Sequence, residues 1–249
     1  MLVSIITATF NSKKYIMDTY NSIIKQTYTN WEWIVTDDCS TDDTYEILKS
    51  ISACDSRVKV FLNGVNSGAA VSRNNCLDHA SGLFISFLDS DDLWEPAKLE
   101  SQVDFINKTN VNFCFTSYAV INESGFSIGI TVDDQDLNSV SYQDMLKKKA
   151  TLGCSTVMIR RSFINDKRMP LLRTGQDYAF WLSLLKEGEL AYLLRKPLTQ
   201  YRITPGSISR NKIKKCKRQW EIYRIEEKLG LLMSLYCFIF YAYRAIFRR

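Results

Sequence analysis

The chain has 249 residues, of which 46% are hydrophobic and 24% are charged, and its formal net charge is +5. This composition allows one large α/β domain or two small ones, and it excludes collagen-like and intrinsically disordered chains. The seven cysteines are an odd number without a Cys-x-x-Cys pair, so we expect reduced thiols in a reducing compartment. Because the N-terminus lacks the pattern of an export signal, a cytoplasmic protein is expected.

The first hundred residues alternate between apolar runs and helical patterns. Continuous apolar, β-branched runs at 3–8 and 33–36 are typical of strands buried on both faces of a parallel sheet. Isoleucines at helical spacing predict a helix between them, at 16–24. Helix, strand, helix, strand and helix should follow at 42–51, 58–62, 68–79, 83–88 and from Pro96 to 106. This order predicts a doubly wound, nucleotide-binding sheet.

The second half of the chain is less regular. Strands are predicted at 112–119, 127–132 and 155–160. A helix is predicted at 176–185, with one apolar face made by Tyr178, Trp181, Leu182 and Leu185. Because the loop at 204–209 contains Pro205-Gly206, it should separate a domain over 1–209, with halves at 1–95 and 96–209, from a tail over 210–249.

The basic charge of the chain belongs to this tail. Residues 210–249 contain eleven Lys and Arg against three Glu, a net charge of +8, which leaves −3 for the rest. A charged helix at 214–228 should precede an apolar stretch at 229–243, whose fifteen residues would reach only about 22 Å as a helix, short of a hydrocarbon core of roughly 30 Å. The tail should therefore lie in a membrane interface, with Phe238, Ile239, Phe240 and Phe247 in the acyl boundary, or else pack on protein. Nucleic-acid binding is not expected, because base-stacking and groove-reading patterns are lacking.

Two acidic clusters follow predicted strands. Asp89-Ser90-Asp91 comes directly after the strand at 83–88, and two carboxylates at such a turn can converge on Mg²⁺ or Mn²⁺; the alternative is a solvated turn that caps the next helix. Asp37 and Asp38 follow the strand at 33–36, where a carboxylate can accept from a pyrimidine imide or from ribose hydroxyls. Ligands collect at such carboxyl ends of parallel strands, so the clusters predict a nucleotide site.

A polar turn at 66–68 leads to Arg73, which either faces the nucleotide or pairs with the acidic clusters. Together, the segments 4–11, 37–42, 66–74 and 87–92 resemble glycosyltransferase family 2 in order and spacing, and the resemblance extends over about residues 3–205. Each motif is weak alone, but the ordered set is specific. The resemblance implies a GT-A fold, a Rossmann-like and mostly parallel central sheet flanked by helices, with a UDP-sugar donor and inversion at the anomeric carbon.

The resemblance also implies roles for individual residues. Asp38 would contact uracil, Asp91 would bind Mn²⁺ or Mg²⁺, and Asp177, at the start of a late helix, would be the catalytic base. The remaining donor-binding residues would be Thr7, Ala8, Thr9 and Phe10 around the base, with Asp37, Arg73, Asp89, Ser90 and Arg202. The chain departs from the family at residues 7–9, where a proline is common, at Cys39, where a glycine is common, and at Gln176, where a glutamate is common.

Two of these roles have alternatives. Asp177 could be a helix N-terminal carboxylate that the helix dipole stabilises. Arg202 could be a surface residue instead of a cation for the donor diphosphate. With the upstream motifs present, Asp177 is expected to take the proton of the acceptor hydroxyl while the metal stabilises the departing diphosphate. The half at 1–95 would then bind nucleotide and the half at 96–209 would bind the acceptor.

The expected enzyme is a metal-dependent hexosyltransferase of bacterial O-antigen or capsule synthesis. It would transfer glucose or galactose from a UDP-sugar to a saccharide on a polyprenyl diphosphate, at the inner face of the cytoplasmic membrane. A sugar nucleotidyltransferase is an alternative, but residues 7–14 lack the glycine-rich loop of that class. A non-catalytic sugar-binding protein of the same fold is another alternative, and loss of turnover on mutation of Asp91 or Asp177 would exclude it.

Overall fold

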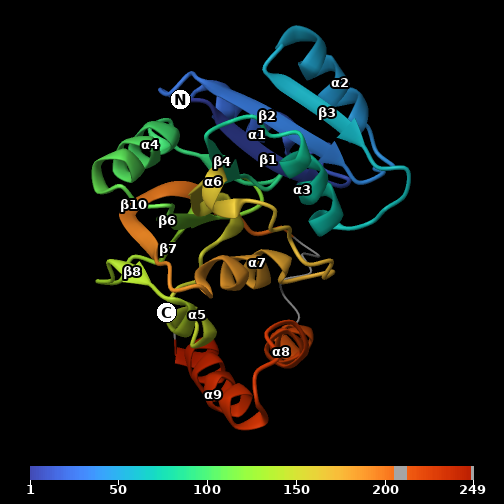
Figure 1. The fold of residues 1–249 in the computed structure, drawn as a ribbon. Coiled ribbons are helices and arrows are strands. Elements are labelled where there is room, and N and C mark those ends of the chain that lie inside the picture. The colour runs from blue at the N-terminus through green and yellow to red at the C-terminus, as the bar shows by residue number, and fades with distance from the viewer. Residues whose placement is uncertain (205–211, 248–249) are drawn as a thin grey trace.

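The computed structural model describes residues 1–204 and 212–247 of the chain. A ten-stranded sheet runs through it in the order β3-β2-β1-β4-β9-β6-β10-β5, with β7 paired to β6 and β8 paired to β10. Helices cover the sheet, and the C-terminal helices form a separate layer beyond α5 and α7 (Figure 1). The predicted loop at 204–209 and the predicted boundary at 209/210 lie outside the described residues, apart from Thr204.

The first half confirms the predicted alternation of strands and helices. Its elements are β1 (Val3–Thr9), α1 (Ile16–Ile24), β2 (Trp31–Asp37), α2 (Thr44–Cys54), β3 (Val58–Leu62), α3 (Ala69–Asp78) and β4 (Phe84–Phe87). All four strands are parallel. Every residue of β2 and β4 is buried, as are all residues of β1 except Ala8, which is why these strands are continuous apolar runs in the sequence.

The second half extends the sheet with strands of both directions. Its elements are β5 (Leu93–Trp94), α4 (Lys98–Thr109), β6 (Phe113–Ile121), β7 (Ser127–Val132), β8 (Ser139–Val140), α5 (Tyr142–Leu146), a 3₁₀ turn (Cys154–Thr156), β9 (Val157–Arg160), α6 (Arg161–Ile164), α7 (Gln176–Leu185) and β10 (Ala191–Arg202). Strand β9 is antiparallel to both β4 and β6 and joins the two halves of the sheet. Two predicted elements begin later than expected. The strand predicted at 155–160 begins at Val157, after the 3₁₀ turn, and the helix predicted from Pro96 begins at Lys98.

The twelve-residue strand β10 was not predicted from the sequence. Arg195, Lys196 and Pro197 interrupt its apolar residues, and its pairing with β6 shifts register on both sides of Pro197. A bulge of this kind lets a proline sit within a sheet. Strand β10 ends at Arg202, so it delivers that residue to the edge of the sheet where the acidic clusters lie.

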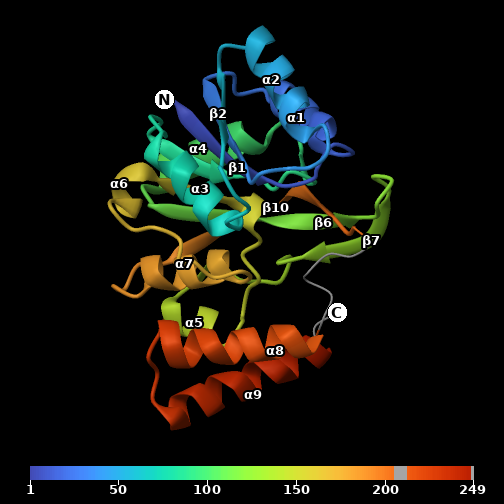
Figure 2. The same cartoon turned by 90° about the vertical axis from the view of Figure 1, so that its right-hand side faces the viewer.

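Helix α7 is buried on more faces than the sequence indicates. Besides the four predicted apolar residues, Ala179, Phe180 and Leu184 are buried. The reason is its place between the sheet and the layer of C-terminal helices, which Figure 2 shows from the side. Trp181 packs edge-on against Phe87 of β4 and Phe113 of β6, which fixes α7 against the sheet.

The tail forms a helical hairpin that packs on the domain. It consists of α8 (Lys212–Glu221), a π-helical turn (Ile222–Glu226) and α9 (Leu231–Phe247). Ile222, Tyr223 and Cys237 are buried in the same core as α7. The alternative expectation, that the tail packs on protein, is confirmed for these residues. Phe238 is half-buried and packs against Trp220 at 5.6 Å between ring centroids, and its entry into an acyl boundary stays a prediction. In the described part of the chain, every helix is too short or too polar to cross a bilayer, and the Phe247 side chain lies outside the described residues.

Candidate active site

The acidic clusters meet at one edge of the sheet, at the carboxyl ends of β1, β2 and β4. The backbone joins them: Asp38 N donates to Thr9 O at 2.8 Å, and Leu88 N donates to Ile6 O at 3.0 Å. The three strand ends are therefore held side by side, as parallel pairing requires. This edge is where ligands of doubly wound sheets bind.

The Asp38 carboxylate lies at the centre of the first loop cluster. It accepts hydrogen bonds from the backbone N–H groups of Ser67 and Gly68, at 2.8 and 2.7 Å, and from Asn63 Nδ2 at 2.8 Å. Asp38 is only 4% exposed, so its main observed role is to fix the loop that begins α3. A carboxylate can accept about four hydrogen bonds, so three partners leave room for one more. Its contact with a base stays a prediction.

Two predicted donor-binding side chains point into the protein. The Asp37 carboxylate is fully buried and accepts from Ser40 N and Ser40 Oγ at 2.7 and 2.6 Å, which closes the turn after β2. Thr7 Oγ1 is buried and accepts from Trp33 Nε1 at 2.8 Å. The Asp37 carboxylate and the Thr7 hydroxyl are therefore used within the fold. Contact of these two residues with the nucleotide stays a prediction.

The other residues of the β1 end differ in exposure. Thr9 is buried, Ala8 is half-buried and Phe10 is 46% exposed. Thr9 Oγ1 has no hydrogen-bond partner among the described residues. Phe10 and Ala8 are therefore the residues of this segment that can border a base from the solvent side.

Arg73 connects the α3 loop to the acidic turn after β4. Its Nη2 donates to Asp89 Oδ1 at 2.5 Å, and it is only 6% exposed. Burial alone would lower the pKa of Arg73, but Cys154, Asp89 and Asp177 lie close enough to raise it above its ordinary value. Nε and Nη1 have no hydrogen-bond partner within the described ranges. The pairing alternative is confirmed. Contact of Arg73 with a nucleotide stays a prediction.

The acidic turn after β4 carries three carboxylates. Burial, and then the charge of Asp89, raise the pKa of Asp91 to about 6. Burial, and then the charges of Asp91 and Asp89, raise the pKa of Asp92 well above its usual range. The Asp92 carboxylate accepts hydrogen bonds from Ser155 Oγ at 2.6 Å and from Arg202 N at 2.9 Å. Asp92 is therefore a bracing residue, and Asp91 is left with uncompensated negative charge.

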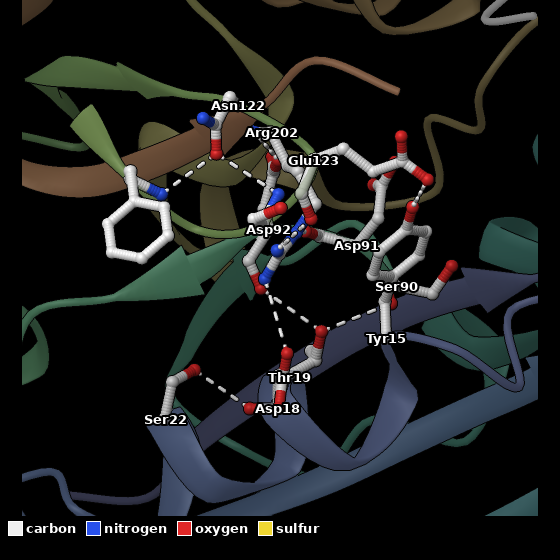
Figure 3. A network of polar contacts seen from close by, with 12 residues as sticks. Tyr15, Asp18, Thr19, Ser22, Ser90, Asp91, Asp92, Asn122, Glu123 and Arg202 are labelled. Atoms are coloured by element: carbon white, nitrogen blue, oxygen red, sulfur yellow. Dashed lines mark hydrogen bonds and ion pairs between the residues drawn. The ribbon is translucent and has the colours of Figure 1, made fainter. Parts of the chain in front are cut away.

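Arg202 contacts the backbone of this turn and braces it, as Figure 3 shows. Its Nε donates to Asp91 O at 2.8 Å, its Nη1 to Glu123 O at 2.9 Å, and its Nη2 pairs with Asp18 at 3.4 Å. The guanidinium also stacks over the Tyr15 ring at 4.9 Å. Each of the three nitrogens has a partner and the side chain is only 3% exposed, so Arg202 is not a surface residue and its observed role is to brace the turn. A contact with the donor diphosphate stays a prediction.

Ser90 belongs to the same bracing network. Ser90 Oγ shares a hydrogen bond of 2.7 Å with Ser12 Oγ, and Thr19 Oγ1 donates to the backbone oxygens of Ser90 and Asp92 at 3.1 and 3.0 Å. Helix α1 therefore supports the acidic turn (Figure 3). A contact from Ser90 to the donor stays a prediction.

Asp177 enters the site from the opposite layer. It lies in the first turn of α7, after Gly175, and its side chain is half-buried. Burial raises the pKa of Cys154, Arg73 opposes the rise, and Asp89 and Asp177 add to it, so these four residues form one electrostatic cluster. None of the described residues donates a hydrogen bond to the Asp177 carboxylate in the structure. Its position and free carboxylate suit a base.

The acidic turn fits a divalent cation that also binds substrate. No group of three or more His, Cys, Asp and Glu is arranged as a complete metal cage among residues 1–204 and 212–247. Mg²⁺ and related ions commonly take one or two carboxylates and complete their shell with water and substrate phosphates. Asp91, whose raised pKa reflects uncompensated charge beside Asp89, supplies such ligands.

Sequence reasoning missed several residues around the site. Ser155 holds both Asp92 and the backbone N–H of Asp89, and Arg173 Nη1 donates to Asn66 Oδ1 at 3.1 Å. Arg173 thereby links the segment before α7 to the loop before α3. Asp92 could have been found from the sequence, because it directly follows Asp91. Ser155 could not, because the sequence around it has no motif.

A sheet that opens with four parallel strands, with an Asp-Ser-Asp turn at its edge, defines a glycosyltransferase of the GT-A fold. The chain belongs to glycosyl transferase family 2, whose model matches residues 4–168. It is 42% identical, over its whole length and 97% of the relative, to TuaG of Bacillus subtilis, which is named for teichuronic acid biosynthesis. It is 39% identical, over 89% of this chain and 85% of the relative, to the UDP-Glc:α-D-GlcNAc-diphosphoundecaprenol β-1,3-glucosyltransferase WfgD of Escherichia coli.

Solved structures confirm the fold. Residues 1–349 of S. aureus TarS in complex with UDP superpose with a TM-score of 0.74 and 24% identity, over 98% of this chain and 71% of that one. The mannosyltransferase PcManGT of Pyrobaculum calidifontis, solved with GDP-Man and Mn²⁺, has a TM-score of 0.70 and 17% identity, over 92% of this chain and 64% of that one. At these identities the likeness extends to the fold alone.

Proposed function

We propose that this glycosyltransferase moves a hexose, glucose or galactose, from a UDP-sugar to a saccharide carried on a polyprenyl diphosphate in surface polysaccharide synthesis. The observation that carries the proposal is the ion pair between Arg73 and Asp89 of the nucleotide half, with Asp177 of the other half near enough to raise the pKa of Arg73. The names of WfgD and WfaP of Escherichia coli specify UDP-glucose and a diphosphoundecaprenol acceptor, which favours glucose.

The proposed mechanism assigns a separate task to each side of the cluster. Asp177 accepts the proton of the acceptor hydroxyl as that oxygen attacks the anomeric carbon. Arg73 keeps Asp89 in place, and its buried guanidinium adds positive charge beside the donor site. Asp91, with Asp89, would hold Mn²⁺ or Mg²⁺, which supplies Lewis-acid stabilisation of the departing diphosphate. A single displacement with the base and the leaving group on opposite faces inverts the configuration.

A donor screen tests the proposed function. We expect purified full-length protein with Mn²⁺ and a GlcNAc-diphosphate-lipid acceptor to release UDP from UDP-glucose or UDP-galactose and to form a disaccharide lipid with inverted configuration. The readouts are UDP release and the anomeric configuration of the product. If the protein instead joined UTP to a sugar phosphate and released pyrophosphate, it would be a nucleotidyltransferase. If it bound sugar without turnover, it would be a sugar-binding protein.

We also propose that the tail attaches the enzyme to the inner face of the cytoplasmic membrane, with residues 1–209 as the catalytic domain and 210–249 as the attachment segment. One face of α9 exposes an apolar stripe, made of Leu231, Leu232, Leu235, Tyr236, Ile239 and Tyr243. Lys147 lies over the Tyr236 ring at 5.3 Å, at the border of this stripe. An apolar helix face with a lysine beside it suits an anionic membrane surface, where a lipid-linked acceptor would lie.

Vesicle flotation tests the stripe. The variant Leu232→Glu/Ile239→Glu should lose flotation with vesicles that contain anionic lipid, because two charges would have to enter the acyl boundary. The control is Phe126→Glu, which changes an equally exposed apolar residue outside the tail and should float like the wild type. Unchanged flotation of the double variant would contradict membrane attachment through α9.

A further inference from the structure

The tail contacts the backbone that positions Asp177. Gly175, two residues before Asp177, has a φ of +71°, a left-handed conformation that favours glycine. A Cβ atom at this position would lie 3.1 Å from Ile222 Cδ1 and 3.5 Å from Arg218 Cγ, both of the tail. The turn that begins α7 is therefore covered directly by α8 and the π-helical turn.

A second contact fixes the neighbouring residue. Arg218 Nε donates to Thr174 Oγ1 at 3.3 Å, and Glu221 pairs with Arg218 Nη1 at 2.8 Å. The two contacts come from successive turns of the tail and meet two successive residues, Thr174 and Gly175. The start of α7 is thus held by a side-chain hydrogen bond and by apolar packing from the same element.

The tail is itself anchored to the domain at several points. Tyr223 and Tyr178 donate to the successive carbonyl oxygens of Leu146 and Met145 at the end of α5. Glu227 accepts from Tyr142 Oη at 2.6 Å and from Lys186 Nζ at 2.9 Å. Both faces of α7 are therefore fixed, one by the sheet and the other by the tail. A π-helical turn is rare, and here it brings Ile222 and Tyr223 together into the core.

We propose that the tail is part of the active site: Ile222 and Arg218 are positioning residues that set the place of the Asp177 carboxylate through Gly175 and Thr174. This inference rests on the proposed role of Asp177 as the base. Helix α9, which carries the exposed apolar stripe, continues from the same π-helical turn across a short connection at 227–230. The segment proposed to face the membrane is therefore joined directly to the element that contacts the turn before Asp177.

The test uses point variants of the full-length chain. Ile222→Ala and Arg218→Ala should each lower kcat roughly 10-fold, because a displacement of about 1 Å at a reacting group can cost up to about 100-fold and these variants should shift Asp177 by less. The affinity for UDP, measured by calorimetry, should stay at the wild-type value, since the donor residues lie on the other half. Ile222→Val should restore most of kcat. Ile225→Ala, at an exposed residue of the same turn, is the matched control and should match the wild type.

Truncating Ile222 also opens a cavity in the core, so Arg218→Ala, at a partly exposed residue, separates positioning from folding. Wild-type kcat in both Ile222→Ala and Arg218→Ala would overturn the proposal. A fall in UDP affinity as large as the fall in kcat would also overturn it. The proposed function fails on a different result: if Asp177→Asn leaves turnover intact, Asp177 is not the base. If Asp177→Asn abolishes turnover while both tail variants are fully active, only the role of the tail is wrong.

Discussion

Replacing Asp177 by asparagine is expected to lower kcat by roughly 10²- to 10⁴-fold, the contribution of a general base. Asparagine keeps the shape of the side chain but cannot accept the proton of the acceptor hydroxyl. In the structure this carboxylate affects the pKa of Arg73 and of Cys154 but has no hydrogen-bond donor among the described residues, so its loss should leave the surrounding contacts intact. The affinity for UDP should change little. Steady-state kinetics with calorimetry of UDP binding measures both quantities.

The control for this prediction is Asp134→Asn, which removes an exposed carboxylate and should behave as the wild type. If Asp177→Asn kept wild-type kcat, the base would have to be another group. A proportional fall of kcat and UDP affinity would indicate that Asp177 supports the donor site instead of acting on the acceptor.

Replacing Asp91 by asparagine is expected to reduce turnover by roughly 10²- to 10³-fold, because several kcal/mol of charge stabilisation at the leaving diphosphate depend on the cation. Burial and the charge of Asp89 raise the pKa of Asp91, so this side chain has the uncompensated charge that a cation would neutralise. The backbone oxygen that Arg202 binds is unaffected by the change. Mn²⁺ binding in the presence of UDP, followed by electron paramagnetic resonance, should weaken together with turnover.

Activity and Mn²⁺ binding together make the Asp91 prediction specific. If Asp91→Asn bound Mn²⁺ and UDP as the wild type does, the metal would be held by other residues. If Mn²⁺ binding were lost while turnover persisted, the cation would not take part in the reaction.

The parallel half of the fold was predictable because its strands are buried on both faces. Such strands are continuous apolar runs, and each ends in the polar residues that gather at the sheet edge. Strand β10 was not predictable on the same grounds, because Lys196 and Pro197 break its pattern at a bulge. Docking of the tail on protein was only the alternative expectation, for a similar reason: Ile222 and Tyr223 stand among charged residues, and only the π-helical turn brings both inward.

The candidate site was predictable as a group of motifs but not side chain by side chain. Motif order brought Asp38, Arg73, Asp89, Asp91 and Asp177 to one edge of the sheet. Spacing alone could not show that Asp37 closes its own turn, that Trp33 donates to the Thr7 hydroxyl, or that Arg202 braces the acidic turn. These outcomes depend on hydrogen bonds between residues far apart in the chain, and a single sequence does not contain them.

The most direct test of the account is a crystal structure of the protein with UDP and Mn²⁺, with anomalous scattering used to locate the metal. The account predicts a manganese peak in coordination distance of an Asp91 carboxylate oxygen, with the diphosphate on the side of the cluster that faces Asp177. A manganese peak away from Asp91, or a diphosphate bound out of reach of Asp177, would contradict it.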